Sequence, residues 1–121
     1  DNGDSIWQPF SRSSLVELQN QQRPIFINLT ADWCLTCLAN EKLTLDTDEL
    51  EALFIQHNVA ALKGDWTNYN AEITELLEEY QRSGVPLYLY YPAGESRANV
   101  LPQLLLLEHI KAVIDKTAIQ Q

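Results

Sequence analysis

Positive charge is scarce in this sequence of 121 residues. Lys and Arg together number 8, Asp and Glu number 17, and the formal net charge is −9 at pH 7. Proteins that bind nucleic acids contact the phosphates through clustered Lys and Arg side chains. The acidic balance therefore argues against a nucleic-acid-binding protein.

Long hydrophobic runs and methionine are also missing. The longest strictly aliphatic run, residues 104–107, is far shorter than the roughly 20 residues that span a bilayer. Because Met is absent even at position 1, we expect a mature form or a domain cut from a longer protein. We assign the polar start, residues 1–8, to a linker or N-terminal extension without signal-peptide character, and residues 9–121 to one compact domain.

The apolar pattern predicts strands and helices that alternate before a final hairpin and helix. Strands are expected at residues 25–29, 59–62, 87–91 and 98–101. Helices are expected at residues 15–18 after capping by Ser13 and Ser14, from the Cys pair through residue 43, from residue 47, at 71–82 and at 104–118. This order predicts an α/β fold, a central mixed β-sheet flanked by helices on both faces.

The two cysteines of the chain form a single Cys-x-x-Cys motif at a predicted strand-to-helix junction. Cys34 is expected at the helix N-terminus, where unpaired N–H groups and the helix dipole favour a thiolate. Cys37 lies three residues on, on the same helical face, and can reach Cys34 to form a disulfide. One sulfur that attacks and one that resolves the mixed disulfide are the minimum for thiol–disulfide exchange.

Three other readings of the motif compete with exchange. A purely structural disulfide would close so short a loop that it adds little stability. A zinc site would have to recruit His57 and His109, whose spacing from the cysteines fits no usual zinc finger or ribbon. The third reading is a pair of inert, buried thiols. A Cys-x-x-Cys within a βαβ pattern favours redox exchange over all three.

The residues around the cysteines resemble the thioredoxin superfamily. The resemblance rests on the run Ala-Asp-Trp-Cys-Leu-Thr-Cys at residues 31–37 and on Gly84-Val85-Pro86 before a predicted strand. More narrowly, residues 26–37, Asn40-Glu41, 64–67 and 82–88 are similar to the C-terminal periplasmic domain of DsbD-type thiol:disulfide interchange proteins. The similarity extends from about Trp7 to the last helix.

The resemblance implies a role for particular residues. Cys34 would be the exposed nucleophile, Cys37 the buried resolving thiol, and Pro86, after Val85, a cis-proline whose loop faces the disulfide and pairs with a partner's backbone. It implies a protein-disulfide reductase that relays electrons from a membrane-embedded domain to an N-terminal periplasmic domain and on to periplasmic acceptors. No dissociable cofactor or metal would be needed, because the electrons travel as thiols.

Charged neighbours bear on the direction of electron flow. Asp32 precedes Cys34, and Glu41 lies one helical turn beyond Cys37; both carboxylates would oppose a thiolate and so favour a reductant. Each could equally be a solvated surface residue. Thioredoxins usually carry a buried Asp where this chain has Asn28, so Glu41 is the remaining candidate for a proton acceptor.

Trp33 is expected to flank the reactive sulfur and to contact partners, while Trp66 and the tyrosines at 80, 88, 90 and 91 are expected in the core. The sequence thus predicts a thiol:disulfide oxidoreductase, monomeric as an isolated domain and periplasmic as part of an inner-membrane protein. Two alternatives stay open: a stand-alone periplasmic thioredoxin-like protein serving cytochrome maturation or stress defence, and a non-catalytic binding module.

Overall fold

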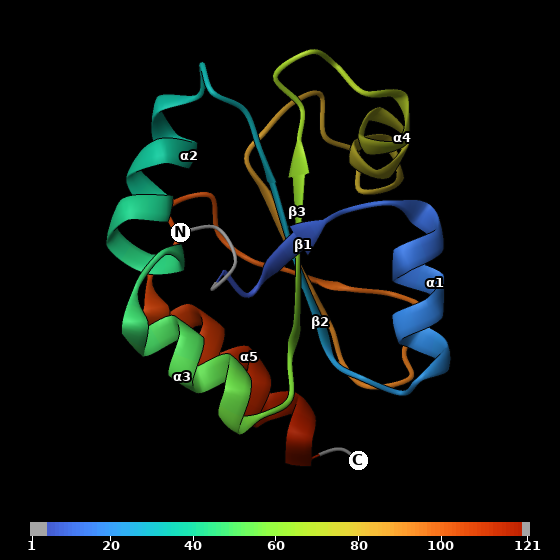
Figure 1. The fold of residues 1–121 in the computed structure, drawn as a ribbon, viewed down its shortest axis with the longest axis vertical. Coiled ribbons are helices and arrows are strands. Elements are labelled where there is room, and N and C mark those ends of the chain that lie inside the picture. Colours follow the sequence, from blue (N-terminus) through green and yellow to red (C-terminus); the bar gives the residue numbers. More distant parts are fainter. Residues whose placement is uncertain (1–4, 120–121) are drawn as a thin grey trace.

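A five-stranded mixed sheet runs through the centre of the molecule, in the strand order β1-β3-β2-β4-β5 (Figure 1). The structure, a computed structural model, describes residues 5–119. Strands β1 and β2 pair with β3 in parallel, whereas β4 pairs with β2 and β5 in antiparallel fashion. The elements are β1 (Trp7–Pro9), α1 (Arg12–Asn20), β2 (Ile25–Thr30), α2 (Leu35–Asn40), η2 (Glu41–Leu45), α3 (Asp48–Gln56), β3 (Ala60–Asp65), α4 (Ala71–Glu79), β4 (Leu87–Tyr91), β5 (Asn99–Val100) and α5 (Leu107–Ile119).

Helices cover both faces of the sheet, as the sequence predicted. Leu15 of α1 and Ile73, Leu76 and Leu77 of α4 pack on one face. Leu50 and Phe54 of α3 and Ile110 and Ile114 of α5 pack on the other. Figure 1 shows the sheet nearly edge-on between these two layers. No helix within residues 5–119 is long and apolar enough to cross a bilayer.

Strand β2 is the central strand of the sheet and lies between the two helical layers. All six of its residues are buried, because β3 and β4 flank it and helices cover its two faces. Its near-continuous apolar sequence predicted this burial on both faces. Asn28 is the polar side chain in the middle of the strand, and it lies under the Cys-x-x-Cys helix.

The sheet has one strand that the sequence pattern did not predict. Residues 7 and 8, assigned to a linker, belong to the edge strand β1, whose Trp7 and Gln8 pair with Ala61 and Leu62. Trp7 packs edge-on against Phe26 at 6.0 Å between ring centroids. Pro9 ends the strand, a position open to proline because an edge strand leaves N–H groups unpaired. Of the rest of the expected linker, residues 5 and 6 precede the strand without regular structure, and residues 1–4 lie outside the described residues.

The helix that follows the cysteines changes from an α-helix to a π-helix after Asn40. Residues 35–40 are α-helical, and η2 continues as a π-helix in which Asp46 N donates to Glu41 O at 2.7 Å. A π-turn adds one residue to the helical repeat, so it changes which side chains face the sheet. In this helix Asn40 and Glu41 are both buried.

Candidate active site

Cys34 and Cys37 are joined by a disulfide bond at the junction of β2 and α2. Their Cα atoms lie 5.2 Å apart, within the usual range for a disulfide. Cys34 is the N-cap residue of α2, and its Sγ accepts a hydrogen bond from Cys37 N at 3.2 Å. Cys34 therefore lies at the N-terminus of the helix, where the sequence placed it, and a backbone N–H donates to its sulfur.

The two cysteines differ in access to solvent. Cys37 is fully buried, whereas Cys34 keeps 8% of its surface exposed. Cys34 is thus less exposed than expected of an attacking thiol, although it is the more accessible of the two. Ala31 and the half-buried Val85 pack against the pair.

The loop opposite the disulfide contains the proline that the sequence singled out. The Val85–Pro86 peptide bond is cis. Pro86 is buried, and its carbonyl oxygen accepts a hydrogen bond from Arg82 Nη1 at 3.3 Å. Because Val85 contacts the cysteine cluster, this loop and the disulfide form one continuous surface.

Asn28 and Glu41 meet beneath the Cys-x-x-Cys helix. Asn28 Nδ2 donates to Glu41 Oε2 at 3.2 Å, and both residues are buried. The carboxylate is therefore not the solvated surface group that the alternative reading allowed. Asn28 Oδ1 is buried and has no hydrogen-bond partner among the described residues. A buried acceptor without a partner costs free energy and is rare in native structures.

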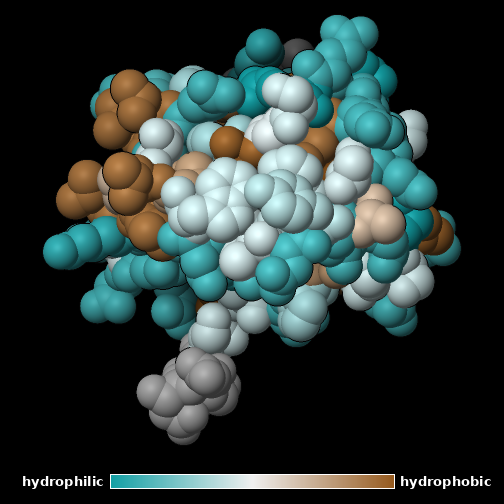
Figure 2. All heavy atoms as spheres, turned by 90° about the horizontal axis from the view of Figure 1, so that it is seen from above, coloured by the Kyte–Doolittle hydropathy of each residue, from teal (hydrophilic) through white to brown (hydrophobic). Residues whose placement is uncertain are grey.

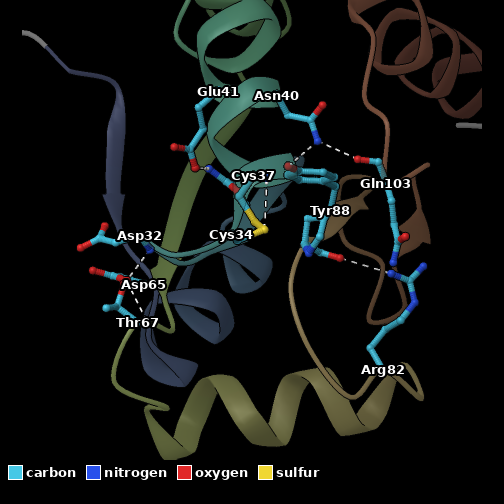
Figure 3. The surroundings of a disulfide bond; sticks show 12 residues. Asp32, Cys34, Cys37, Asn40, Glu41, Asp65, Thr67, Arg82, Tyr88 and Gln103 are labelled. Atoms are coloured by element: carbon cyan, nitrogen blue, oxygen red, sulfur yellow. Dashed lines mark hydrogen bonds between the residues drawn. A yellow bond between two sulfur atoms is a disulfide. The ribbon is translucent and has the colours of Figure 1, made fainter.

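Asn40 connects α2 to two distant segments and was not predicted as a site residue. Its Nδ2 donates to Tyr88 Oη at 2.9 Å and to the Gln103 carbonyl oxygen at 2.6 Å, and its Oδ1 accepts from Leu105 N at 3.1 Å (Figure 3). Burial is the main cause that raises the pKa of Tyr88, the hydrogen bond from Asn40 opposes it, and the charge of Glu41 adds to it, so that the pKa is raised to about 12. The sequence signal for it was its place in the Asn40-Glu41 stretch that resembles DsbD-type domains, which did not indicate these bonds.

Asp32 and Trp33, immediately before Cys34, are both exposed and are held by the loop after β3. Asp32 N donates to Thr67 Oγ1 at 2.9 Å, and Trp33 Nε1 donates to the Thr67 carbonyl oxygen at 3.2 Å. Hydrogen bonds from the Thr67 hydroxyl and backbone N–H hold the pKa of Asp65 below its ordinary value; burial opposes them, and Lys63 lowers the pKa slightly further. Two hydrogen bonds to Thr67 therefore fix the position of the segment directly before Cys34.

The described residues include no group of three or more His, Cys, Asp and Glu side chains placed to hold a metal ion.

The aromatic side chains expected in the core lie there. Trp66, Tyr88, Tyr90 and Tyr91 are buried, and Tyr80 is half-buried against Tyr91.

The family model described as thioredoxin-like matches residues 6–93. The chain belongs to the thioredoxin-like family. Among curated proteins it is similar to the thiol:disulfide interchange protein DsbD of Yersinia pestis, with 34% identity over 76 residues, and to DsbD of Haemophilus ducreyi, with 30% identity over 94 residues. These matches cover 63% and 73% of this chain but only 12% and 16% of those proteins.

Solved structures agree with the fold. The oxidised C-terminal domain of Neisseria meningitidis DsbD matches with a TM-score of 0.69 and 19% identity, over 91% of this chain and 99% of that domain. A thioredoxin from Thermus thermophilus matches with a TM-score of 0.70 and 14% identity, over 94% and 87% of the two chains. The thioredoxin-like mixed sheet predicted from sequence is confirmed. The bonded Cys34–Cys37 pair supplies the two sulfurs that thiol–disulfide exchange requires.

Proposed function

We propose that this chain is a protein-disulfide reductase domain that passes electrons to partner proteins by exchange at Cys34 and Cys37. The observation that carries the proposal is the unequal cysteine pair: Cys34 reaches solvent at the start of α2 while Cys37 is fully buried behind it. This arrangement suits one sulfur to intermolecular attack and the other to an intramolecular step.

The exchange runs in two balanced steps. In the reduced chain the Cys34 thiolate attacks one sulfur of the partner's disulfide; the partner's S–S bond breaks, and its other sulfur leaves as a thiolate that takes a proton. Cys37 then attacks Cys34 Sγ, releases the partner's second thiol and forms the Cys34–Cys37 disulfide. Two electrons and two protons pass from the chain's dithiol to the partner.

Glu41 is the proposed acceptor of the Cys37 proton in the second step. It is a buried carboxylate one turn beyond Cys37, and the hydrogen bond from Asn28 holds it in place. Asp32 is the proposed second carboxylate that disfavours a thiolate at Cys34. Val85 and Pro86 are the proposed docking loop for a partner's backbone.

We further propose that the domain works in the periplasm as part of a DsbD-type membrane protein. A membrane-embedded domain would reduce Cys34–Cys37, and an N-terminal periplasmic domain would accept the electrons. The similarity to DsbD proteins that are several times longer than the match supports this arrangement. Because the electrons move as thiols, the relay uses no dissociable cofactor.

Two serine variants test the exchange mechanism. The reduced wild-type domain is mixed with a synthetic disulfide-bonded peptide, and released thiols and covalent adducts are followed by mass spectrometry. Cys34→Ser is expected to abolish both peptide reduction and adduct formation. Cys37→Ser is expected to accumulate the adduct between Cys34 and the peptide, because the resolving thiol is gone.

Circular dichroism and the unfolding midpoint of each variant, compared with the reduced wild type, control for folding. Reduction of the peptide by Cys34→Ser at the wild-type rate would contradict the proposal. Failure of the reduced wild-type domain to reduce the peptide would also contradict it, and would favour a binding module that uses the cysteines only as a structural disulfide.

A further inference from the structure

An aromatic and acidic surface lies beside the disulfide, and apart from the proposed effect of Asp32 on the Cys34 thiolate it has no part in the exchange steps. Trp33 and Tyr69 keep 49% and 62% of their surface exposed, with ring centroids 6.0 Å apart and an interplanar angle of 31°. The buried Trp66 supports Tyr69 from behind, edge to face at 4.9 Å. We call this surface the acidic shelf; its members are Asp32, Trp33, Asp65, Thr67 and Tyr69.

Hydrogen bonds hold the shelf as one unit. Thr67 connects its two segments, because its hydroxyl accepts from Asp32 N and its carbonyl oxygen accepts from Trp33 Nε1. Thr67 N in turn donates to Asp65 Oδ1 at 3.0 Å, and Tyr69 N donates to the Trp66 carbonyl oxygen at 3.0 Å. The aromatic faces and the carboxylates are therefore already arranged before any partner binds.

The shelf faces the same end of the molecule as the disulfide. Asp32 and Trp33 lie in the short segment between β2 and Cys34, whereas Asp65 is the last residue of β3 and Thr67 and Tyr69 follow it. Both segments therefore lie at the carboxyl ends of adjacent parallel strands. Figure 2 views this end, where pale residues of intermediate hydropathy occupy much of the centre and brown, hydrophobic residues gather at one side. In Figure 3 the carboxylates of Asp32 and Asp65 lie on the same side of the cysteine pair.

We propose that the acidic shelf binds a Lys or Arg side chain next to the reactive cysteine of the partner, so that the domain prefers disulfides with cationic neighbours. This inference rests on the proposed reductase function and names the class of disulfide that it serves.

Charge and aromatic surface together point to a cation as the occupant. Ammonium and guanidinium groups are attracted to the faces of Trp and Tyr, and more strongly when a carboxylate pairs with them. Asp32 and Asp65 are both exposed, and the chain carries a net charge of −9, so approach of a cationic segment is also favoured at long range. Leu35, on the other side of Cys34, is 82% exposed and offers an apolar contact instead.

Three peptides test the preference. They share one internal disulfide and differ only in the residues beside each cysteine, which are Arg, Gln or Glu. The rate of reduction of each by the reduced domain is divided by its rate with dithiothreitol, which removes the effect of the flanking charge on the peptide's own sulfur. We expect this corrected rate to be at least about tenfold higher for the Arg peptide than for the Glu peptide at low ionic strength, and the ratio to shrink in salt.

Matched variants locate the effect. Asp32→Asn with Asp65→Asn is expected to bring the Arg-to-Glu ratio close to one. Glu17→Gln with Asp115→Asn removes the same amount of charge from exposed positions on α1 and α5 and is expected to keep the ratio. The Asp65→Asn change could unfold the loop by weakening the Asp65–Thr67 bonds. Asp32→Asn alone avoids this, because the Asp32 side chain makes no hydrogen bond within residues 5–119, and it is expected to lower the Arg-to-Glu ratio by itself.

The outcomes separate the two proposals. Equal corrected rates for all three peptides would overturn the shelf while leaving the reductase function intact. An unchanged preference for the Arg peptide in the Asp32→Asn, Asp65→Asn variant would also overturn the shelf proposal, because the net charge of the chain would then be the cause of the preference. Failure to reduce any peptide would overturn the reductase function and the shelf with it.

Discussion

Asn40 joins three parts of the fold through one amide group. It ties the Cys-x-x-Cys helix to Tyr88 of β4 and to the segment before α5 at Gln103 and Leu105. We expect Asn40→Ala to lower the free energy of unfolding by about 3 kcal/mol, because it leaves buried donors and acceptors without partners. Urea denaturation measures this change.

Asn20→Ala is the control for this substitution. Asn20 is exposed at the last position of α1, and its replacement is expected to stay within about 0.5 kcal/mol of the wild type. If both variants lose equally little stability, the Asn40 hydrogen bonds do not hold these segments together.

Tyr88 makes the fold sensitive to alkaline pH. Its pKa is raised to about 12 in the folded state, above the ordinary value of 10.0. The unfolded chain therefore loses this proton first, so stability is fully present below pH 10 and declines as the pH rises toward 12. A difference of this size corresponds to about 2 to 3 kcal/mol. Burial also raises the pKa of Tyr91, which acts in the same direction.

Urea unfolding at pH 9, 10 and 11 checks the sign and the source. The wild type is expected to lose stability over this range, and Tyr88→Phe is expected to lose less, although it starts lower because Asn40 loses a partner. Parallel declines in the two proteins would show that Tyr88 is not the titrating group.

At the scale of elements, the capping residue of α1 differs from the sequence expectation. The pattern favoured Ser13 and Ser14 as caps, but the N-cap is Ser11, whose Oγ accepts from Ser14 N at 3.0 Å. We expect Ser11→Ala to lower the free energy of unfolding by about 1 kcal/mol, because the N–H at the helix start loses its acceptor. Thermal unfolding compares this variant with Ser13→Ala, which is expected to leave the stability nearly unchanged. A larger loss of stability for Ser13→Ala than for Ser11→Ala would contradict the assignment of Ser11 as the N-cap.

Strongly patterned elements could be predicted and weakly patterned ones could not. The apolar β2 and β4 and the amphipathic α4 appear close to the expected residues. Strand β1 has three residues and a proline, so no alternation marks it; its pairing with β3 and the packing of Trp7 create it. The π-turn of η2 has no known signature in sequence, yet it accompanies the burial of Glu41.

At the scale of the whole molecule, the motif residues could be predicted but their surroundings could not. Cys34, Cys37, Val85 and Pro86 carry a recognisable pattern, and the fold brings them together. The acidic shelf escaped prediction because Tyr69 lies in the loop between β3 and α4, outside every motif that the sequence carries. Its contact with Trp33 depends on β2 and β3 being neighbours in the sheet, which spacing along the chain does not reveal.

The proposed direction of electron flow rests on the balance of charge around Cys34. A backbone N–H donates to its sulfur, the residues between the cysteines, Leu35 and Thr36, bring no charge, and we propose that Asp32 and Glu41 oppose the thiolate. A thiolate that is poorly stabilised leaves the dithiol more reducing. The central claim, that this domain donates electrons, is therefore a claim about its reduction potential.

The reduction potential of the Cys34–Cys37 couple is the most direct test of that claim. Equilibration of the domain with defined thiol–disulfide buffers, with the two redox forms counted by alkylation and mass spectrometry, measures it. We predict a value more negative than about −200 mV, toward the roughly −270 mV of thioredoxin. A value near −120 mV, typical of strong disulfide-forming oxidants, would contradict the account.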